Sequence, residues 1–424
     1  AGEEAMLFEY LADPSSTRYN VTRRYTIRGE VDLGRLEAAL RDVVAVHGPL
    51  HTSYGPQRQR LTPDRAMSFE VLPFQTSDAF DRFADVQRAV QFDLDTGPLI
   101  RVHAAPTADA ETAILIGLHH ISIDAGTFDL LWDQVAHRYA GGGLPHLGHT
   151  YAEHGEWQRS TGSAASAAFW LDRSAERRPT RPIGFATPIP AVPDGYVSRG
   201  VDLAPAELAG AGGTPFAASM AATAAALSAF VADDWVEFGI TASAKDHAVT
   251  APLVGYYLNT LPVGFEVDRS VPFADLVASA SATVSDTLPH RTYPFASILR
   301  DARAAGHELP HVEFLLAYES LTTPRLAGAG VSQRILASGT AVADLSLFVQ
   351  ERSDSVRIGL EYRGSVLDGP GAHRLLDVFE SVLVGGLRRP STRVADLLEP
   401  HLGRDLTGLE PVPASATVLD RIAT

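Results

Sequence analysis

The 424-residue sequence contains no cysteine, which excludes disulfides, thiolate nucleophiles and cysteine-based metal sites together. It also lacks a long apolar run, because the most apolar stretch, 217–232, is rich in alanine and interrupted by serine and threonine. Positive charge is scarce, with 35 Lys and Arg against 51 Asp and Glu and a net charge of −16. Nucleic acids and anionic membranes select basic surfaces, so neither is expected as the main partner. A cytoplasmic location fits this composition.

Several familiar catalytic motifs are also missing from the sequence. It has no G-x-S-x-G nucleophile elbow, no G-x-x-x-x-G-K phosphate loop and no H-E-x-x-H zinc motif. The content of 45% hydrophobic and 20% charged residues is typical of a soluble globular protein. The length predicts two domains of about 200 residues each.

Hydrophobic periodicity predicts that strands and helices alternate along the chain, which indicates an α/β fold. A proline-rich stretch without periodicity, 179–195, is the candidate linker between the two domains. Strands are predicted at 19–27, 68–72, 99–104, 114–118, 235–242, 311–318, 345–350 and 356–362. Helices are predicted after Asp32, which is placed to cap the first of them, and at 78–90, 128–139, 169–176, 215–231, 273–286 and 370–387.

The stretch 114–135 carries the strongest candidate for chemistry. A short apolar strand ends at His119 and His120, and a turn with Asp124 and Gly126 leads into an amphipathic helix. Adjacent strand residues point to opposite faces, so only one of the two imidazoles can serve a given cleft. For the same reason His119, His120 and Asp124 do not converge as metal ligands. One imidazole can act in proton transfer at neutral pH, although a structural histidine at a strand end is the commoner case.

Asp124 has two possible roles. It can orient the imidazole, as the third member of a catalytic triad does, or it can pair with a buried cation. Arg101 lies in a predicted strand beside the 114–118 strand, and a buried arginine needs a carboxylate partner. We therefore predict an Arg101–Asp124 ion pair with an architectural role, so that Asp124→Asn should harm folding together with activity.

The stretch LHHISIDAGT resembles the HHxxxDG signature of condensation domains from nonribosomal peptide synthetases, members of the chloramphenicol acetyltransferase-like superfamily. The resemblance continues along nearly the whole chain. RGEVDLGRLEAALRDVVAVHGPLHT and QFDLDTGPLIRV precede the signature, and YAEHGEWQ with FWLDR follows it. Later, GYYLNTLPV is similar to the family's GxFVNTLPL pattern, and HRTYPFASIL to its HxxYPFexL.

This resemblance implies an α/β fold of two chloramphenicol acetyltransferase-like lobes, arranged as a V-shaped pseudo-dimer with a central tunnel. The N-terminal lobe would span 1–178, the linker 179–195 and the C-terminal lobe 196–398. Residues 399–424 would form a tail or linker toward an adjacent adenylation domain. The ends of the chain therefore suggest an excised domain that is monomeric by itself.

The resemblance also implies a reaction, the formation of an amide bond between an acyl or peptidyl thioester and an aminoacyl group. Donor and acceptor peptidyl carrier proteins would deliver both on phosphopantetheine arms, with no intrinsic cofactor. His120 maps to the catalytic histidine, which positions the amine or accepts its proton, and His119 to its structural partner. Backbone N–H groups of Ala125 and Gly126 would face the thioester oxygen. The substrate-side candidates are Asn259, Ser346 and Tyr256, whose alternatives are a turn-capping Asn, a strand Ser and a packing aromatic.

The sequence departs from the family at one position of the signature. Ala125 stands where the family has Gly, which would cost stability if the turn required a positive φ there. This departure leaves open a catalytically quiet docking module that recruits another enzyme to a carrier protein. A free-standing acyltransferase using coenzyme A or a soluble amine is a third possibility.

Overall fold

The computed structural model describes residues 2–55, 61–73, 76–107, 111–160, 164–178, 192–230, 234–245, 250–310 and 312–402. The chain forms two compact units. Unit 1 comprises Ala1–Thr161, Lys245–Leu258 and Leu321–Gly339, and unit 2 comprises Gly162–Ala244, Asn259–Ser320 and Thr340–Thr424. Unit 1 therefore includes two segments from beyond the predicted boundary at 179–195. Most of that predicted linker and of the predicted tail lie outside the described residues.

Unit 1 is built on a five-stranded sheet with the order β2-β3-β4-β1-β9. β1 pairs antiparallel with both β4 and β9, and β3 pairs antiparallel with β4. The strands are β1 (Asn20–Arg28), β2 (Met67–Val71), β3 (Ile100–Pro106), β4 (Glu111–His119) and β9 (Gly330–Leu336). The helices of this unit are α1 (Gly2–Ala12), α2 (Leu33–Val46), α3 (Pro63–Ala66), α4 (Ser77–Gln87), α5 (Ala125–Tyr139) and α6 (Tyr151–Ser160), with short 3-10 helices η1 (Gly48–Leu50) and η2 (His120–Ser122).

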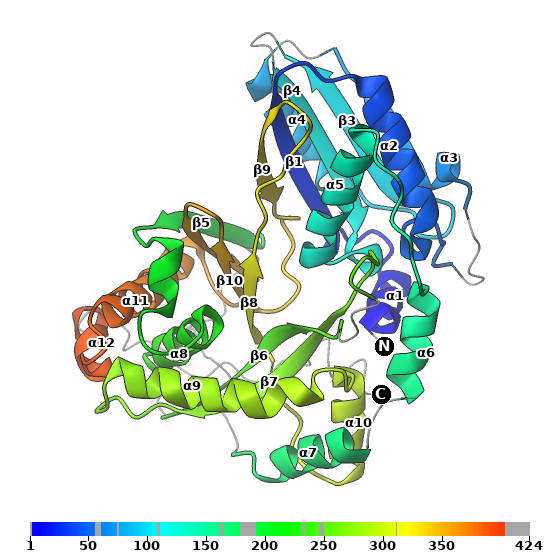
Figure 1. The fold of residues 1–424 in the computed structure, drawn as a ribbon. Helices are drawn as coiled ribbons and strands as arrows, with labels where there is room; N and C mark the ends of the chain where they lie inside the picture. The colour runs from blue at the N-terminus through cyan, green and yellow to red at the C-terminus, as the bar shows by residue number, and fades with distance from the viewer. Residues whose placement is uncertain are drawn as a thin grey trace. The chain divides into compact units, whose positions relative to one another are not determined.

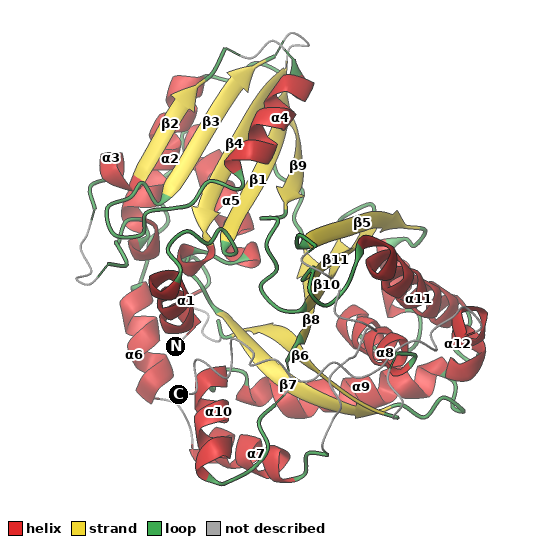
Figure 2. Ribbon diagram, turned by 180° about the vertical axis from the view of Figure 1, so that it is seen from behind, coloured by secondary structure: helices red, strands yellow, loops and turns green. Residues whose placement is uncertain are grey.

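Alternation along β4 divides its side chains between two buried clusters. Ile114, Ile116 and Leu118 pack in the cluster formed with α2 and α5. Ala113 and Leu115 pack in the cluster formed with α4 on the other face. Figure 1 shows α2 and α5 in front of this sheet, and Figure 2 shows α4 in front of it from behind. β4 is thus covered by helices on both faces, which explains its continuous apolar run.

Unit 2 contains a six-stranded mixed sheet with the order β5-β11-β10-β8-β6-β7. The strands are β5 (Gly195–Val201), β6 (Trp235–Ser243), β7 (Leu258–Glu266), β8 (Phe314–Ser320), β10 (Leu345–Glu351) and β11 (Val356–Tyr362). The helices are α7 (Ala164–Ala175), α8 (Pro215–Ser228), α9 (Phe273–Thr287), α10 (Phe295–Ala304), α11 (Gly369–Arg388) and α12 (Val394–Leu402), with η3 (Pro205–Ala209) and η5 (Leu288–His290).

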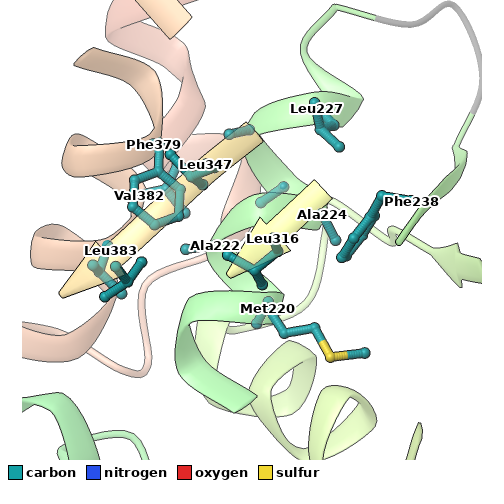
Figure 3. Packing of buried hydrophobic residues seen from close by; sticks show 14 of the residues in the cluster. Met220, Ala222, Ala224, Leu227, Phe238, Leu316, Leu347, Phe379, Val382 and Leu383 are labelled. Carbon is teal, nitrogen blue, oxygen red and sulfur yellow. The ribbon is translucent and has the colours of Figure 1, made fainter. Parts of the chain in front are cut away.

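Most of the alanine-rich stretch belongs to α8, the central helix of unit 2, which ends at Ser228. Every residue of α8 from Ala217 to Ser228 is buried, so the helix has no solvent-facing side over that length. Small side chains allow α9 and α11 to approach it closely. Figure 3 shows α8 side chains beside Phe238 and Leu316 of the sheet and Phe379 of α11. Among the described residues, no helix combines the length and apolar character needed to cross a membrane.

Most predicted elements are confirmed within a few residues, and Asp32 caps α2 by accepting a hydrogen bond from the Arg35 backbone N–H at 3.0 Å. Several elements were not predicted, including α1, α10, β5 and β9. In β5 and β9 exposed and partly buried residues alternate, and their sequences carry few large apolar side chains. Such edge strands depend on pairing with a neighbour rather than on an apolar face, so periodicity detects them poorly.

Candidate active site

The two adjacent histidines lie where β4 ends. His119 is the last residue of the strand, and His120 begins η2. Ile123 is extended, with φ −159° and ψ 149°, and Asp124 caps the N-terminus of α5. The whole passage from the end of β4 to the first residue of α5 therefore takes five residues, 120–124, which places His120 beside the first turn of α5.

His119 has a structural role. Its side chain is 3% exposed, and the rings of Tyr10 and Tyr19 lie 6.3 and 5.8 Å from its ring. Its Nδ1 accepts a hydrogen bond from the Ile121 backbone N–H at 3.2 Å, so the neutral ring carries its proton on Nε2. Burial, followed by the neighbouring His120, lowers the pKa of His119 to about 3. His119 is therefore neutral near pH 7.

His120 has the opposite tautomer. Its Nδ1 lies 2.5 Å from the backbone carbonyl oxygen of Ile123, and a carbonyl can only accept. Nδ1 therefore carries the proton, and Nε2 carries the free lone pair of the neutral ring. The residue is partly exposed, and the Tyr256 ring meets it edge to face with centroids 5.3 Å apart. This arrangement presents Nε2 as a proton acceptor.

The carboxylate of Asp124 binds backbone N–H groups of unit 1. Its carboxylate is 4% exposed, and its two oxygens accept from the N–H groups of Thr127 at 2.8 Å and Tyr257 at 2.9 Å. The Nδ1 of His120 is bound to Ile123 instead, so the triad role weighed for Asp124 is not supported. Asp124 caps α5 and attaches the segment 250–257 to it.

The predicted Arg101–Asp124 ion pair is wrong. The Arg101 guanidinium donates to the backbone carbonyls of Val90, at 3.0 Å, and Gln91, and it lies 3.9 Å from the Phe92 ring centroid. In the sheet Arg101 is paired with Gly117, which belongs to the face of β4 that carries Ala113 and Leu115. Asp124 begins a helix on the other face, so the sheet separates the two side chains.

The buried arginine beside α5 is Arg23 of β1. Its side chain is 1% exposed and forms an ion pair with Asp129, which is 7% exposed. Arg23 Nη2 also donates to the Ala125 carbonyl at 2.9 Å, and its guanidinium lies 4.4 Å from the Phe128 ring centroid. The second carboxylate oxygen of Asp129 accepts from the Thr322 backbone N–H at 2.9 Å. The strand of Arg101 does pair with β4, as predicted, but the arginine that reaches α5 comes from β1, the other neighbour of β4.

A second set of polar contacts holds the segment 250–257 within unit 1. Lys245 Nζ donates to the Ala251 and Leu253 carbonyls, both at 2.9 Å. His47 accepts from the Val254 N–H at 3.3 Å through Nδ1 and contacts Gln134 Oε1 at 2.6 Å through Nε2. Burial is the main cause that lowers the pKa of His47 to about 4, so the ring is neutral and suited to both contacts.

Ala125 and Gly126 are the first two residues of α5. Neither has a positive φ, so the alanine at position 125 is not strained by the turn. Backbone N–H groups at these helix positions have no intrahelical acceptor. Ala125 is partly exposed and Gly126 is exposed.

Two predicted substrate-side residues belong to unit 2. Asn259 donates through Nδ2 to the carbonyls of Arg291 at 2.8 Å and Tyr293 at 2.7 Å, and its Oδ1 accepts from the Phe295 N–H at 3.1 Å. Its amide is thus committed to the turn before α10, which is the turn-capping alternative. Ser346 is buried in β10, where it is paired with Leu315 and Glu361, and its substrate role stays a prediction.

Sequence reasoning missed Thr127, Arg23 and Asp129. The Asp-x-x-Thr spacing of 124–127 is a capping-box signature that identifies Thr127 as a structural residue. Arg23 lies in the predicted strand 19–27 at a position that must face the core. An arginine at such a position was the signal that a buried carboxylate partner is needed. Within the described part of the chain, no group of three or more His, Asp or Glu side chains is arranged to hold a metal ion.

Comparisons with known proteins identify the family of this chain. A family model described as Condensation domain matches residues 4–194 and 209–403. Phosphinothricin tripeptide synthetase PhsB of Streptomyces viridochromogenes is 26% identical over 95% of this chain, and surfactin synthase subunit 1 of Bacillus subtilis (strain 168) is 23% identical over 89%. The chain spans only 37% and 11% of those two proteins.

Solved structures share the fold. The condensation domain from Monacolin K polyketide synthase MokA superposes with a TM-score of 0.81 at 17% identity, covering 93% of this chain and 98% of that one. The X-domain from teicoplanin biosynthesis gives a TM-score of 0.76 at 21% identity, covering 93% and 96%. At these identities the two likenesses establish the fold alone.

Proposed function

Because this chain belongs to the condensation-domain family, whose members form amide bonds by acyl transfer, we propose that it joins an acyl or peptidyl thioester to an aminoacyl amine. The observation that carries the proposal is the tautomer of His120. The Ile123 carbonyl accepts a hydrogen bond from Nδ1–H, so the lone pair available to a substrate is on Nε2. His119 has the opposite tautomer and is buried, which leaves one imidazole for the reaction.

In the proposed reaction, Nε2 of His120 accepts a hydrogen bond from the attacking amine and orients its lone pair toward the thioester carbonyl carbon. A carbon–nitrogen bond forms, and the amine proton passes to Nε2. The carbon–sulfur bond then breaks, and the imidazolium returns that proton to the departing thiolate. Proton and charge balance without a metal or redox partner in the scheme.

The negative charge that develops on the thioester oxygen needs hydrogen-bond donors to stabilise it. We assign this role to the N–H groups of Ala125 and Gly126, which have no intrahelical acceptors and belong to exposed or partly exposed residues at the positive end of α5. Tyr256, edge-on to His120, would limit the positions open to the substrate beside the ring. Replacing Gly by Ala at 125 preserves the N–H, so the departure from the signature is compatible with activity.

The relatives are peptide synthetases, which favours carrier-bound substrates for this chain. We propose donor and acceptor carrier proteins, each with a phosphopantetheine arm, as partners, and an adenylation domain as neighbour. The acidic, cysteine-free composition favours a cytoplasmic reaction.

The test is a condensation assay with the natural flanking carrier domains, loaded with a panel of donor and acceptor aminoacyl groups, and product detection by mass spectrometry. We expect turnover by the wild type and its loss in His120→Ala. The control is His149→Ala, because His149 is half exposed and is paired with Glu153 on the surface of α6. Undiminished turnover by His120→Ala would refute the assignment.

Two other outcomes identify the alternative functions. Binding of carriers without turnover for any donor and acceptor pair would refute the enzyme assignment and favour a docking module. Turnover with a soluble amine or coenzyme A thioester, but with no acceptor carrier, would favour a free-standing acyltransferase.

A further inference from the structure

A continuous chain of hydrogen bonds leads from the His120 ring to the segment 250–257. It starts with the bond from His120 Nδ1 to the Ile123 carbonyl at 2.5 Å. The N–H of the same peptide group, that of Asp124, donates to Thr127 Oγ1 at 3.1 Å. Thr127 Oγ1 then donates to the Gly255 carbonyl at 2.6 Å. The Ile123–Asp124 peptide is therefore bound on both sides, to the imidazole and to the threonine.

The Thr127 hydroxyl is the central group of this chain. A hydroxyl has one proton to donate and two lone pairs to accept with, and both functions are used here. The competing acceptor for its proton, the Asp124 carbonyl, is farther away at 3.3 Å. Thr127 is 3% exposed, so water has little access to replace either bond. Hydrogen bonds linked in this way in a buried site polarise and strengthen one another.

The far end of the chain returns to His120. Gly255 is followed by Tyr256, whose ring meets the His120 ring edge to face. The backbone carbonyl of Tyr256 accepts from the Tyr151 hydroxyl at 2.6 Å, which fixes the next peptide group as well. Thr127 thus binds both the peptide that keeps the His120 proton on Nδ1 and the segment that carries the Tyr256 ring.

We propose that Thr127 is a positioning residue for His120. Through the Ile123–Asp124 peptide its hydroxyl orients the carbonyl that keeps the imidazole proton on Nδ1, and through Gly255 it places Tyr256 against the ring. This inference rests on the proposed function of His120, but it makes a prediction about the ring itself that does not depend on activity.

The test compares Thr127→Val, which keeps the shape and removes the hydroxyl, with Thr127→Ser, which keeps the hydroxyl. A matched control is Thr223→Val, because Thr223 is 1% exposed and its hydroxyl donates to the Ser219 carbonyl at 2.8 Å inside α8 of unit 2. The first readout is the tautomer of His120, from proton–nitrogen correlation spectra of protein labelled with ¹⁵N-histidine and assigned by comparison with His120→Ala.

We expect the Nδ1–H form in the wild type, in Thr127→Ser and in Thr223→Val. We expect a mixture of the two His120 tautomers in Thr127→Val. In the condensation assay kcat of Thr127→Val should fall by about tenfold with KM little changed, the effect of one buried hydrogen bond expressed in the transition state.

An unchanged His120 tautomer in folded Thr127→Val would overturn the positioning role, whatever the activity. An equal tautomer change in Thr223→Val would also overturn it, because the effect would then be general loosening. If the tautomer changes as expected but the wild type condenses no substrate pair, the positioning role stands and the proposed function fails.

Discussion

Replacing Asp124 by Asn tests how the active-site turn is attached to the rest of unit 1. The two carboxylate oxygens accept from two backbone N–H groups, those of Thr127 and Tyr257, at 2.8 and 2.9 Å. An amide has one oxygen, so one of these donors must face an NH2 group. Asn caps a helix as well as Asp does, so the oxygen should stay on Thr127 and the Tyr257 bond should be lost.

The expected loss of unfolding free energy is about 2 to 3 kcal/mol, the value of a buried hydrogen bond to a charged acceptor whose donor is left unpaired. Urea unfolding measures that loss. Hydrogen exchange should localise it as faster exchange at the Tyr257 amide, and activity should fall because Tyr256 moves with that segment. Asp368→Asn is the control, since Asp368 caps α11 through one N–H, that of Gly371, and should change stability little.

The reasoning is refuted if Asp124→Asn is as stable and active as the wild type and the Tyr257 amide keeps its protection. It is also refuted if Asp368→Asn is destabilised to the same extent, because the loss would then come from the helix cap and not from the second bond.

Two further predictions concern buried charge. Arg23→Met should destabilise unit 1 by about 3 to 5 kcal/mol, because it leaves the Asp129 carboxylate buried without its ion-pair partner. The double variant Arg23→Met with Asp129→Leu should recover most of that loss, as measured by urea unfolding. A double variant no more stable than the single one would contradict this. The pKa of His119 is about 3 in the folded protein, which is below its value in the unfolded chain. As the pH falls, the unfolded chain therefore binds the proton first. The contribution of His119 to stability is full above about pH 6.5 and declines below it. Between pH 6 and 4, His119→Asn should unfold with a pH slope shallower by about 1.4 kcal/mol per unit, and an unchanged slope would contradict burial as the cause.

The sequence by itself determined most of the helices and strands and the position of the candidate site. The apolar run of β4, the alternation of β10 and β11 and the helical stripe of α2 depend only on neighbours along the chain, so periodicity predicts them. The sequence also predicted that the two imidazoles have different surroundings, and their hydrogen bonds differ in the structure. Strand alternation is not the reason, because His119 ends β4 and His120 already belongs to η2.

Only the tertiary structure decided which groups meet. The predicted pair of Arg101 with Asp124 was wrong because the face of the sheet that Arg101 occupies depends on its register against Gly117. The true pair, Arg23 with Asp129, joins residues 106 positions apart, and the chain from Thr127 to Gly255 spans 128 positions. Asn259 likewise spends its amide on a turn 32 to 36 residues away. Contacts of this range are set by how strands and helices pack, which the pattern of residues along the chain does not record.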